Sequence, residues 1–223
     1  QKDAYGEEVT NVYSADPVVG DIEVTAMKAR AAAVLAGCRD GNDRCIWLLS
    51  SESFHRLNPA AKQSFLHDLP AGQVLVLDAK VDSAPQYGVT GSFQGHPFVA
   101  CFHHNDGGRM KMHGNMDHIA ANYTQARAAS TFVGAGVTPD AINQNYALYQ
   151  LFIDLAHGYA YDKKTWLTAY TTARYGKQME KVNTVWSIVA DTIYAEPAGY
   201  TAYNHYLYER PQLLSPDMLS RVK

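Results

Sequence analysis

Long apolar runs are missing from this sequence of 223 residues. No stretch approaches the ~20 consecutive apolar residues that a membrane-spanning helix needs, so we expect no such helix. A strong charge of one sign is missing too. The net charge is −3 and there is no basic run, which argues against nucleic acid as a partner. An initiating methionine is absent, so Gln1 suggests a processed or partial product, or simply a chosen boundary.

The usual signatures of nucleotide, nucleophile and metal sites are also missing. There is no G-x-S-x-G elbow and no phosphate-binding loop, and Gly134–Gly136 lacks the third glycine of a dinucleotide fingerprint. By composition, a metal cluster could be formed by His103, His104, Asp106 and His113. However, adjacent histidines on a strand point to opposite faces, and no H-x-x-x-H pair is present. We therefore expect no metal site and no cofactor.

Cysteine is scarce, with three residues. Cys38 and Cys45 flank a polar turn, so they form either a disulfide in an oxidising compartment or two free thiols. Cys101 lies in an apolar strand and is expected to be a buried small hydrophobe. Asn122 begins an Asn-Tyr-Thr glycosylation sequon, which has meaning only in a secreted chain. Together these features lead us to expect a secreted or lysosomal protein.

Short apolar stretches alternate with helical patterns through the first two thirds of the chain. A short strand and its following loop are expected within 4–13, and further strands are expected at 45–49, 74–78, 97–102 and 131–133. The expected helices are 19–35, 59–69, 114–129 and 139–155. This alternation predicts an α/β fold with parallel strands and right-handed crossovers. Five such strands fit either a free-standing doubly wound sheet or a little more than half of an eight-stranded barrel.

The pattern changes near residue 158. Residues 165–175, residues 179–194 and a tail from residue 216 have helical patterns, and no further strand is predicted. We therefore expect two domains. Residues 1–158 would form a domain with about five parallel strands, and residues 159–223 would be a helical segment of a second domain.

The stretch from residue 131 to residue 150 has the strongest indication of a functional site. After its short strand we predict a turn at Gly134–Gly136, an N-cap at Thr138 and a helix that begins at Pro139. Asp140 then lies in the first helical turn, at the carboxyl end of the sheet, where α/β enzymes place catalytic groups. Asp140 is either such a group or an acid that interacts with the helix dipole.

Polar residues follow the ends of other expected strands. After the fourth strand, His104 and Asn105 are placed to hydrogen-bond a ligand, and Gly107–Gly108 allows close backbone approach; a solvated turn is the alternative. Glu52 and Asp78 follow two earlier strands. Each is either a general acid or base or a structural carboxylate.

Several blocks of the sequence, taken in order, resemble one known family. Residues 134–149 (G-A-G-V-T-P-D-A-I-N-Q-N-Y-A-L-Y) are similar to G-x-G-x-x-P-E-G-I-x-Q-N-x-x-x-Y, a signature of the α-N-acetylglucosaminidases, glycoside hydrolase family 89. Residues 92–108 (S-F-Q-G-H-P-F-V-A-C-F-H-H-N-D-G-G) are similar to the family's S-F-x-G-x-P-F-x-W-C-x-L-H-N-F-G-G. Further blocks in the same order are 46–49, 72–78, 165–176 and 209–213.

The resemblance implies a fold and a kind of ligand. The chain would be the C-terminal part of a (β/α)8 TIM-type barrel followed by the start of an all-α domain, and its ligand would be a glycan. Full members of the family are much longer. Because an open half-barrel leaves strand edges exposed, another polypeptide or the rest of a longer precursor would complete the barrel.

The resemblance also assigns roles to residues. Family members are retaining glycosidases, in which one carboxylate attacks the anomeric carbon and a second protonates the leaving oxygen. The nucleophile's place is taken by Asp140, one methylene shorter than the family's glutamate. The acid's place is taken by Val12, which cannot transfer a proton. The other implied pocket positions are Asn11, Glu52, His104, Asn105 and Asp106.

Two of these pocket positions, Glu52 and Asp106, replace a tryptophan and a phenylalanine of the family. Together with Val12, these changes favour a catalytically degenerate homologue that serves as a glycan-binding or structural subunit. The alternative is an active retaining exo-glycosidase that removes terminal α-linked N-acetylglucosamine, with Asp140 as nucleophile and Glu52 or Asp106 as substitute acid. A register shift that brought Glu8 onto the acid position would favour this alternative.

Overall fold

The computed structural model describes residues 21–55, 57–104, 114–139 and 144–195. The chain divides into two units, residues 1–103 with 122–138 and residues 104–121 with 139–223. The short strand and loop expected within 4–13 and the helical tail expected from 216 lie outside the described residues. The domain boundary expected near residue 158 falls inside the second unit and stays a prediction.

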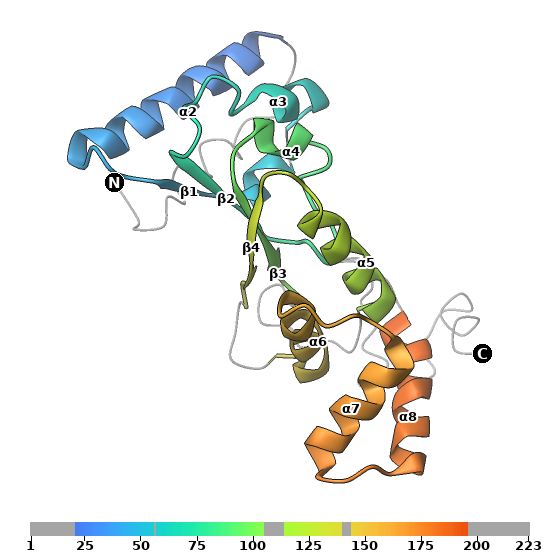
Figure 1. The fold of residues 1–223 in the computed structure, drawn as a ribbon. Coiled ribbons are helices and arrows are strands. Elements are labelled where there is room, and N and C mark those ends of the chain that lie inside the picture. Colours follow the sequence, from blue (N-terminus) through green and yellow to red (C-terminus); the bar gives the residue numbers. More distant parts are fainter. Residues whose placement is uncertain (1–20, 56, 105–113, 140–143, 196–223) are drawn as a thin grey trace. The chain divides into compact units, whose positions relative to one another are not determined.

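The first unit contains a sheet of four parallel strands in the order β1-β2-β3-β4 (Figure 1). Each strand pairs in parallel with the next one along the chain, so each connection must cross over from one end of the sheet to the other. The strands are Trp47–Ser50 (β1), Val74–Asp78 (β2), Phe98–Phe102 (β3) and Phe132–Val137 (β4). The parallel α/β arrangement predicted from the alternating pattern is confirmed.

The glycine segment that precedes the candidate nucleophile is strand and not turn. Gly134 and Gly136 lie inside β4 and pair with Val99 and Cys101 of β3. A Cβ atom at Gly136 would lie 3.2 Å from Cys101 Sγ and 3.3 Å from Val99 Cγ1. The prediction of a turn is therefore wrong, because here glycine permits a close approach between two strands.

Three helices and a short 3-10 helix accompany these strands. They are Asp21–Gly41 (α2), Ser51–Phe54 (η1), Pro59–Ser64 (α3) and Gly91–Gln94 (α4). The helix expected to end at residue 35 continues to Gly41. α3 begins as predicted, because Asn58 Oδ1 accepts the backbone N–H of Ala61 at 2.8 Å, but it ends at Ser64, earlier than residue 69.

The two faces of the sheet differ in burial. Leu48 is 55% exposed, and Leu75, Leu77 and Val99 on the same face are half-buried. The opposite face is fully buried and consists of Trp47, Leu49, Val74, Val76, Phe98, Ala100 and Phe102. Because side chains alternate between the faces of a strand, this pattern assigns one face to the core of the unit.

Four phenylalanines form what we call the aromatic core: Phe54, Phe65, Phe93 and Phe98. The ring centroid of Phe54 is 5.4 Å from those of both Phe65 and Phe93, and the Phe93 and Phe98 centroids are also 5.4 Å apart. All three pairs meet edge to face, an arrangement that adds about 0.5–1.5 kcal/mol per pair beyond the area buried. The aromatic core therefore contributes to the stability of the first unit.

The second unit is helical in its described part. Its helices are Tyr146–Ala156 (α6), Lys163–Tyr175 (α7), Glu180–Asp191 (α8) and the 3-10 helix Ile193–Ala195 (η3). Helix Met116–Arg127 (α5) contributes residues to both units. α7 and α8 lie side by side (Figure 1) and confirm the helical patterns expected at 165–175 and 179–194. Within the described ranges, no helix has the length and apolarity to cross a membrane.

α6 starts later than the sequence predicts. Thr138 is not a helix cap, because its N–H donates to Phe102 O at 3.0 Å and so extends the pairing of β3 with β4. Asn145 is the cap of α6, with its Oδ1 accepting the N–H of Leu148 at 3.4 Å. The prediction of a helix that begins at Pro139 is wrong, because β4 runs to Val137, Pro139 itself is not helical, and α6 begins at Tyr146 with Asn145 as its cap.

Candidate functional site

Charged and titratable side chains gather where β1, β2 and β3 end. Glu52 lies in η1 directly after β1, Asp78 ends β2, Lys80 and Asp82 lie in the turn after β2, and His103 follows β3. The carboxyl ends of parallel strands meet at one edge of a sheet, which is where α/β proteins bind ligands. We call these five residues the carboxyl-edge cluster. All of them belong to the first unit.

Glu52, the expected substitute acid, is held in an ion pair. Lys80 Nζ lies 2.9 Å from Glu52 Oε1, and the lysine side chain is only 10% exposed. A general acid must carry a proton until the leaving group takes it, whereas this ion pair depends on the ionised carboxylate. The sequence did not indicate Lys80 as a site residue. Its position two residues after the end of β2 was the only signal for it.

Asp78 anchors the turn that follows β2. Its side chain is fully buried, and its two oxygens accept the backbone N–H groups of Gln86, at 3.0 and 3.1 Å, and Tyr87, at 3.1 Å. Burial raises the pKa of this carboxyl, and the hydrogen bonds from Gln86, Ser51 and Tyr87 oppose that rise. Of the two roles left open for Asp78, these contacts support the structural one.

Asp82 is a buried acid that the sequence analysis did not single out. Its exposure is 3%, and burial raises the pKa of its carboxyl to about 7. The backbone N–H of His103, 3.5 Å from Asp82 Oδ1, and the charge of Lys80 act in the opposite direction. A carboxyl with a pKa near 7 takes up and releases a proton near neutral pH, which is a property of many functional acids.

His103 connects the ends of β3 and β4. Its ring Nδ1 is 2.5 Å from the backbone oxygen of Thr138, the first residue after β4. Because a carbonyl oxygen only accepts, Nδ1 must carry the hydrogen. By strand alternation, His103 belongs to the same face as Val99, the face opposite the aromatic core. The sequence pattern indicated His103 only as a metal ligand, because the contact with Thr138 is not signalled by local spacing.

His55 completes the electrostatic surroundings of Glu52. Burial lowers the pKa of its imidazole, the charge of Glu52 raises it, and the charges of Lys80 and Lys62 lower it again. Among the described residues, His55 Nε2 and Ser53 Oγ are buried without a hydrogen-bond partner. Unsatisfied buried polar atoms are rare, so this corner of the edge has unused hydrogen-bonding capacity.

Most site residues expected from the sequence lie outside the described residues. These are Asn11, Val12, Asn105, Asp106, His113 and Asp140. His104 is described and is 5% exposed. A Cβ atom at Gly114 would lie 3.2 Å from the His104 ring and 2.6 Å from Leu148 Cδ1, so glycine allows this ring to be buried. The substrate-binding role of His104 stays a prediction.

The two expected covalent modifications also stay predictions. Cys38 and Cys45 are free thiols in the structure. Burial, followed by the proximity of Cys45, raises the pKa of the Cys38 thiol. Asn122 lies inside α5, and its Nδ2 donates to the backbone oxygen of Asp82 at 3.2 Å. A glycan on Asn122 would have to replace this hydrogen bond.

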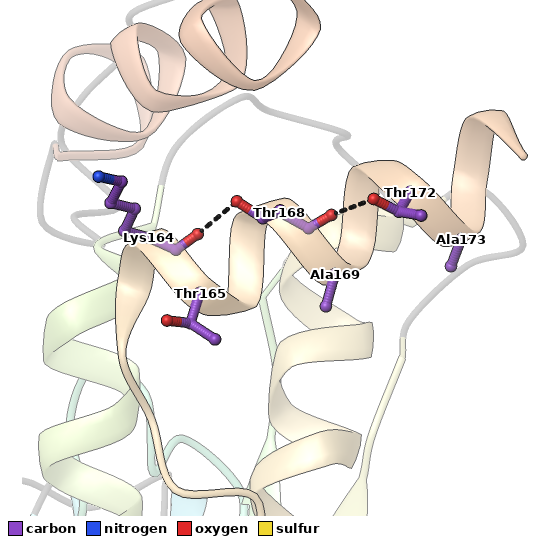
Figure 2. Close-up of a pocket in the computed structure, with 6 residues that line it drawn as sticks. All are labelled: Lys164, Thr165, Thr168, Ala169, Thr172 and Ala173. Carbon is purple, nitrogen blue, oxygen red and sulfur yellow. Dashed lines mark hydrogen bonds between the residues drawn. The ribbon is translucent and has the colours of Figure 1, made fainter. Parts of the chain in front are cut away.

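A separate groove of about 750 Å³ runs along one face of α7 (Figure 2). Two of its three threonine hydroxyl groups are already used within the helix, because Thr168 donates to Lys164 O at 3.0 Å and Thr172 donates to Thr168 O at 2.7 Å. Threonine and alanine at helical spacing are typical of a surface for close helix packing. The described parts of the chain also contain no group of three or more metal-ligating side chains. The carboxyl-edge cluster therefore remains the candidate site.

Comparison with known proteins assigns the family. The profile of the α-N-acetylglucosaminidase (NAGLU) TIM-barrel domain matches residues 1–158, and that of the NAGLU C-terminal domain matches residues 166–221. The chain belongs to the α-N-acetylglucosaminidase family. It is 31% identical over 180 residues to α-N-acetylglucosaminidase of Homo sapiens, covering 77% of this chain and 24% of the human protein. The resemblance inferred from the sequence blocks is thereby confirmed.

Solved structures of the α-N-acetylglucosaminidase family agree with the fold. A family 89 glycoside hydrolase from Clostridium perfringens in complex with PUGNAc matches with a TM-score of 0.67 and 25% identity. A variant of that enzyme with two glutamates changed to glutamine, in complex with its substrate GlcNAc-α-1,4-galactose, matches with a TM-score of 0.68 and 25% identity. Each match covers 78% of this chain and 19% of the solved chain.

These matches confirm the fold class. The parallel sheet is the C-terminal part of a TIM-type barrel, and the helices that follow begin a helical C-terminal domain. The chain spans about a quarter of the length of its human relative and about a fifth of the solved one. In a complete barrel, the face that carries Leu48 and Val99 would be the interior.

Proposed function

We propose that this chain is the glycan-binding part of a catalytically degenerate glycoside hydrolase. One observation carries the proposal: Glu52, the described candidate for a substitute acid, is engaged by Lys80 at 2.9 Å. The resemblance places Val12 where the family has its acid. General acid catalysis accelerates hydrolysis by about 10²–10⁴-fold, so its loss would slow hydrolysis by about that factor. Sugar binding needs only hydrogen-bonding groups and would survive.

The ligand that we propose is a glycan with a terminal α-linked N-acetylglucosamine. The solved relative from Clostridium perfringens was captured with GlcNAc-α-1,4-galactose, and this chain keeps several pocket residues of the family pattern. The residues that we propose to contact the sugar are Asn11, His104, Asn105, Asp106 and Asp140. Another polypeptide or the rest of a longer precursor would complete the barrel, and the compartment would be secreted or lysosomal.

A second candidate function is an active retaining glycosidase. It is favoured by the carboxylate that Asp140 retains in the nucleophile's place. An aspartate nucleophile is chemically competent, because retaining glycosidases use either aspartate or glutamate. In this case Glu52 would have to leave Lys80, or Asp106 would have to act as the acid.

Two measurements on the same protein separate these functions. The full-length protein is purified from its natural source, so that any completing chain is retained. Binding of GlcNAc-α-1,4-galactose is measured by calorimetry, and hydrolysis of a chromogenic α-N-acetylglucosaminide is followed over hours. We expect binding with hydrolysis at the background rate.

Recombinant Asp140→Asn protein, purified together with any completing chain, is the control for both measurements. Hydrolysis that is lost in Asp140→Asn would establish the active glycosidase and contradict the degenerate assignment. The absence of binding and of hydrolysis in a protein with an intact thermal transition would contradict both candidates.

A further inference from the structure

Two cysteines of the first unit lie on either side of one short turn, and neither the comparisons nor the proposed function assigns them a role. Cys38 lies in the last turn of α2 and is exposed. Cys45 is half-buried and lies two residues before β1. Both cysteines belong to the same unit, so a bond between them would act within the first unit alone.

A hydrogen-bonded turn brings the two cysteines together. The Asn42 N–H donates to Cys38 O at 3.2 Å, and the Cys45 N–H donates to Asn42 O at 3.0 Å. The Asn42 side chain also accepts the N–H of Arg44 at 3.0 Å, which holds the turn between these two hydrogen bonds. Asn42 therefore connects the backbones of both cysteines. Burial raises the pKa of the Cys38 thiol, and the nearby Cys45 thiol raises it further, so the two thiols interact.

In the described part of the chain, the end of α2 is weakly held. Leu35 is the last buried residue of this helix, and residues 36–41 are all exposed. A Cβ atom added at Gly41 would meet no described atom within 4 Å. A hydrogen bond from Arg39 Nη1 to Gln73 Oε1 does reach this end, but it is exposed and 3.4 Å long. A covalent bond at this point would therefore add a connection where packing supplies little.

We propose that Cys38 and Cys45 form a disulfide that connects the exposed end of α2 to the start of β1 and stabilises the first unit. The oxidant is a low-molecular-mass disulfide such as oxidised glutathione. The exposed Cys38 attacks it as the thiolate and forms a mixed disulfide, which releases one glutathione thiol. The Cys45 thiolate then attacks Cys38 Sγ and expels the second glutathione thiol. The two cysteines thus lose two electrons and two protons, which reduce the oxidant to two thiols.

The third cysteine provides an internal comparison. Cys101 is 2% exposed, and its Sγ would lie 3.2 Å from a Cβ atom at Gly136 inside the sheet. Burial raises the pKa of its thiol to about 12, so the thiolate that disulfide exchange requires is scarce at neutral pH. Oxidation should therefore be confined to Cys38 and Cys45. This bond is independent of glycan binding, so the failure of the proposed function would leave it unaffected.

The first test is a peptide map of the full-length protein. The protein is equilibrated with oxidised glutathione, its free thiols are blocked with iodoacetamide, and it is digested without reduction. Trypsin cleaves after Arg39 and Arg44, so the two cysteines fall on separate peptides. We expect peptides 31–39 and 45–56 as one linked pair that separates on reduction. Recovery of both peptides in alkylated or glutathione-bound form would overturn the proposal.

The second test measures what the bond does. The oxidised wild type should have a thermal midpoint about 5–10 °C above that of the reduced protein, because the bond closes the loop 38–45 and restricts the unfolded chain. Cys38→Ser and Cys45→Ser should each abolish this difference. Cys101→Ala, the matched control, should keep it, although removing a buried side chain lowers the midpoint of both redox states.

Hydrogen exchange gives a local readout of the same bond. In the oxidised protein, the backbone amides of residues 36–41 should exchange more slowly than in the reduced protein, while those of the aromatic core keep their rates. Equal midpoints and equal exchange in the two redox states would overturn the stabilising role of the bond. A redox difference that persists in Cys38→Ser, or that is lost in folded Cys101→Ala, would overturn the assignment of the bond to this pair.

Discussion

The aromatic core and the carboxyl-edge cluster are neighbouring parts of one parallel sheet, but they are built from different side chains. The aromatic core buries four phenylalanines at centroid separations of 5.4 Å, with no polar group to satisfy. The carboxyl-edge cluster contains two buried carboxyls and a lysine that is nearly buried. Burying apolar surface stabilises a fold, whereas burying a charge costs stability unless it is paired.

This difference separates the residues of the first unit that stabilise the fold from those that are candidates for function. Asp78 and Glu52 have clear partners, the backbone of the following turn and Lys80. Asp82 has weaker support, because its hydrogen bonds and nearby charges only partly offset burial, which raises its pKa to about 7. A residue that costs stability without a strong partner is a candidate for function. We therefore expect that substitutions can change the two regions independently.

The largest expected effect comes from the aromatic core. Phe65→Ala should lower the free energy of unfolding by about 3–5 kcal/mol, because the ring is 2% exposed and packs against Trp47 and Phe54. Chemical denaturation measures this change. Glycan affinity of the protein that remains folded should be unchanged. A loss of affinity in the folded fraction would show that the two regions are not independent.

The second largest effect should come from Asp82, which should make the free energy of unfolding depend on pH. The pKa of this carboxyl is about 7 in the folded chain and 3.8 as the reference for the unfolded chain. Between these values the folded state keeps a proton that the unfolded state releases, so the stabilisation present below about pH 4 is lost as the pH rises to about 7. The loss is at most about 4 kcal/mol, from about three pKa units.

The control for this prediction is Asp82→Asn, which cannot ionise and keeps an acceptor for the His103 N–H. Urea unfolding at a series of pH values from about 4 to about 8 should show wild-type stability falling more steeply than that of the variant. Parallel pH profiles for the two proteins would mean that Asp82 does not keep its proton in the folded chain.

The third largest effect, a loss of stability, should come from substitution of Asp78. Asp78→Ala removes the acceptor of the Gln86 and Tyr87 N–H groups and leaves them buried, at a cost of about 1–3 kcal/mol. Asp78→Asn keeps one acceptor oxygen and should cost less. Thermal unfolding of the two variants measures the difference. If they are equally destabilised, the hydrogen bonds to the turn are not what this carboxyl contributes.

Much of this fold could be predicted from the sequence, and the failures have physical reasons. Alternating apolar and helical patterns located β1, β2 and β3, because buried parallel strands are continuous apolar runs. The glycines of β4 led to the wrong prediction of a turn. Gly136 instead allows the close approach to Cys101, which exists only in the folded sheet. The start of α6 was misplaced because Asn145 competes with Thr138 as a cap.

The candidate site was less predictable than the fold. Glu52 was identified because it follows a strand, but its partner Lys80 comes from the next strand end along the sheet, and no local spacing signals that contact. The same holds for His103 and Thr138, which are 35 residues apart. Family resemblance predicts that Asp140 takes the nucleophile's place, but it could not foresee contacts made by residues that depart from the family pattern.

The smallest expected effect is that of the Glu52–Lys80 ion pair. Glu52→Gln should cost about 0.2–1 kcal/mol, because Glu52 is 44% exposed and solvent screens the pair. The cost should shrink at high salt. The matched control is Asp68→Asn, which breaks the more exposed pair with Lys28, also at 2.9 Å. We expect hydrolysis of the chromogenic substrate at the background rate in both the wild type and Glu52→Gln, whereas hydrolysis above background in the wild type that falls with this substitution would return Glu52 to the catalytic machinery.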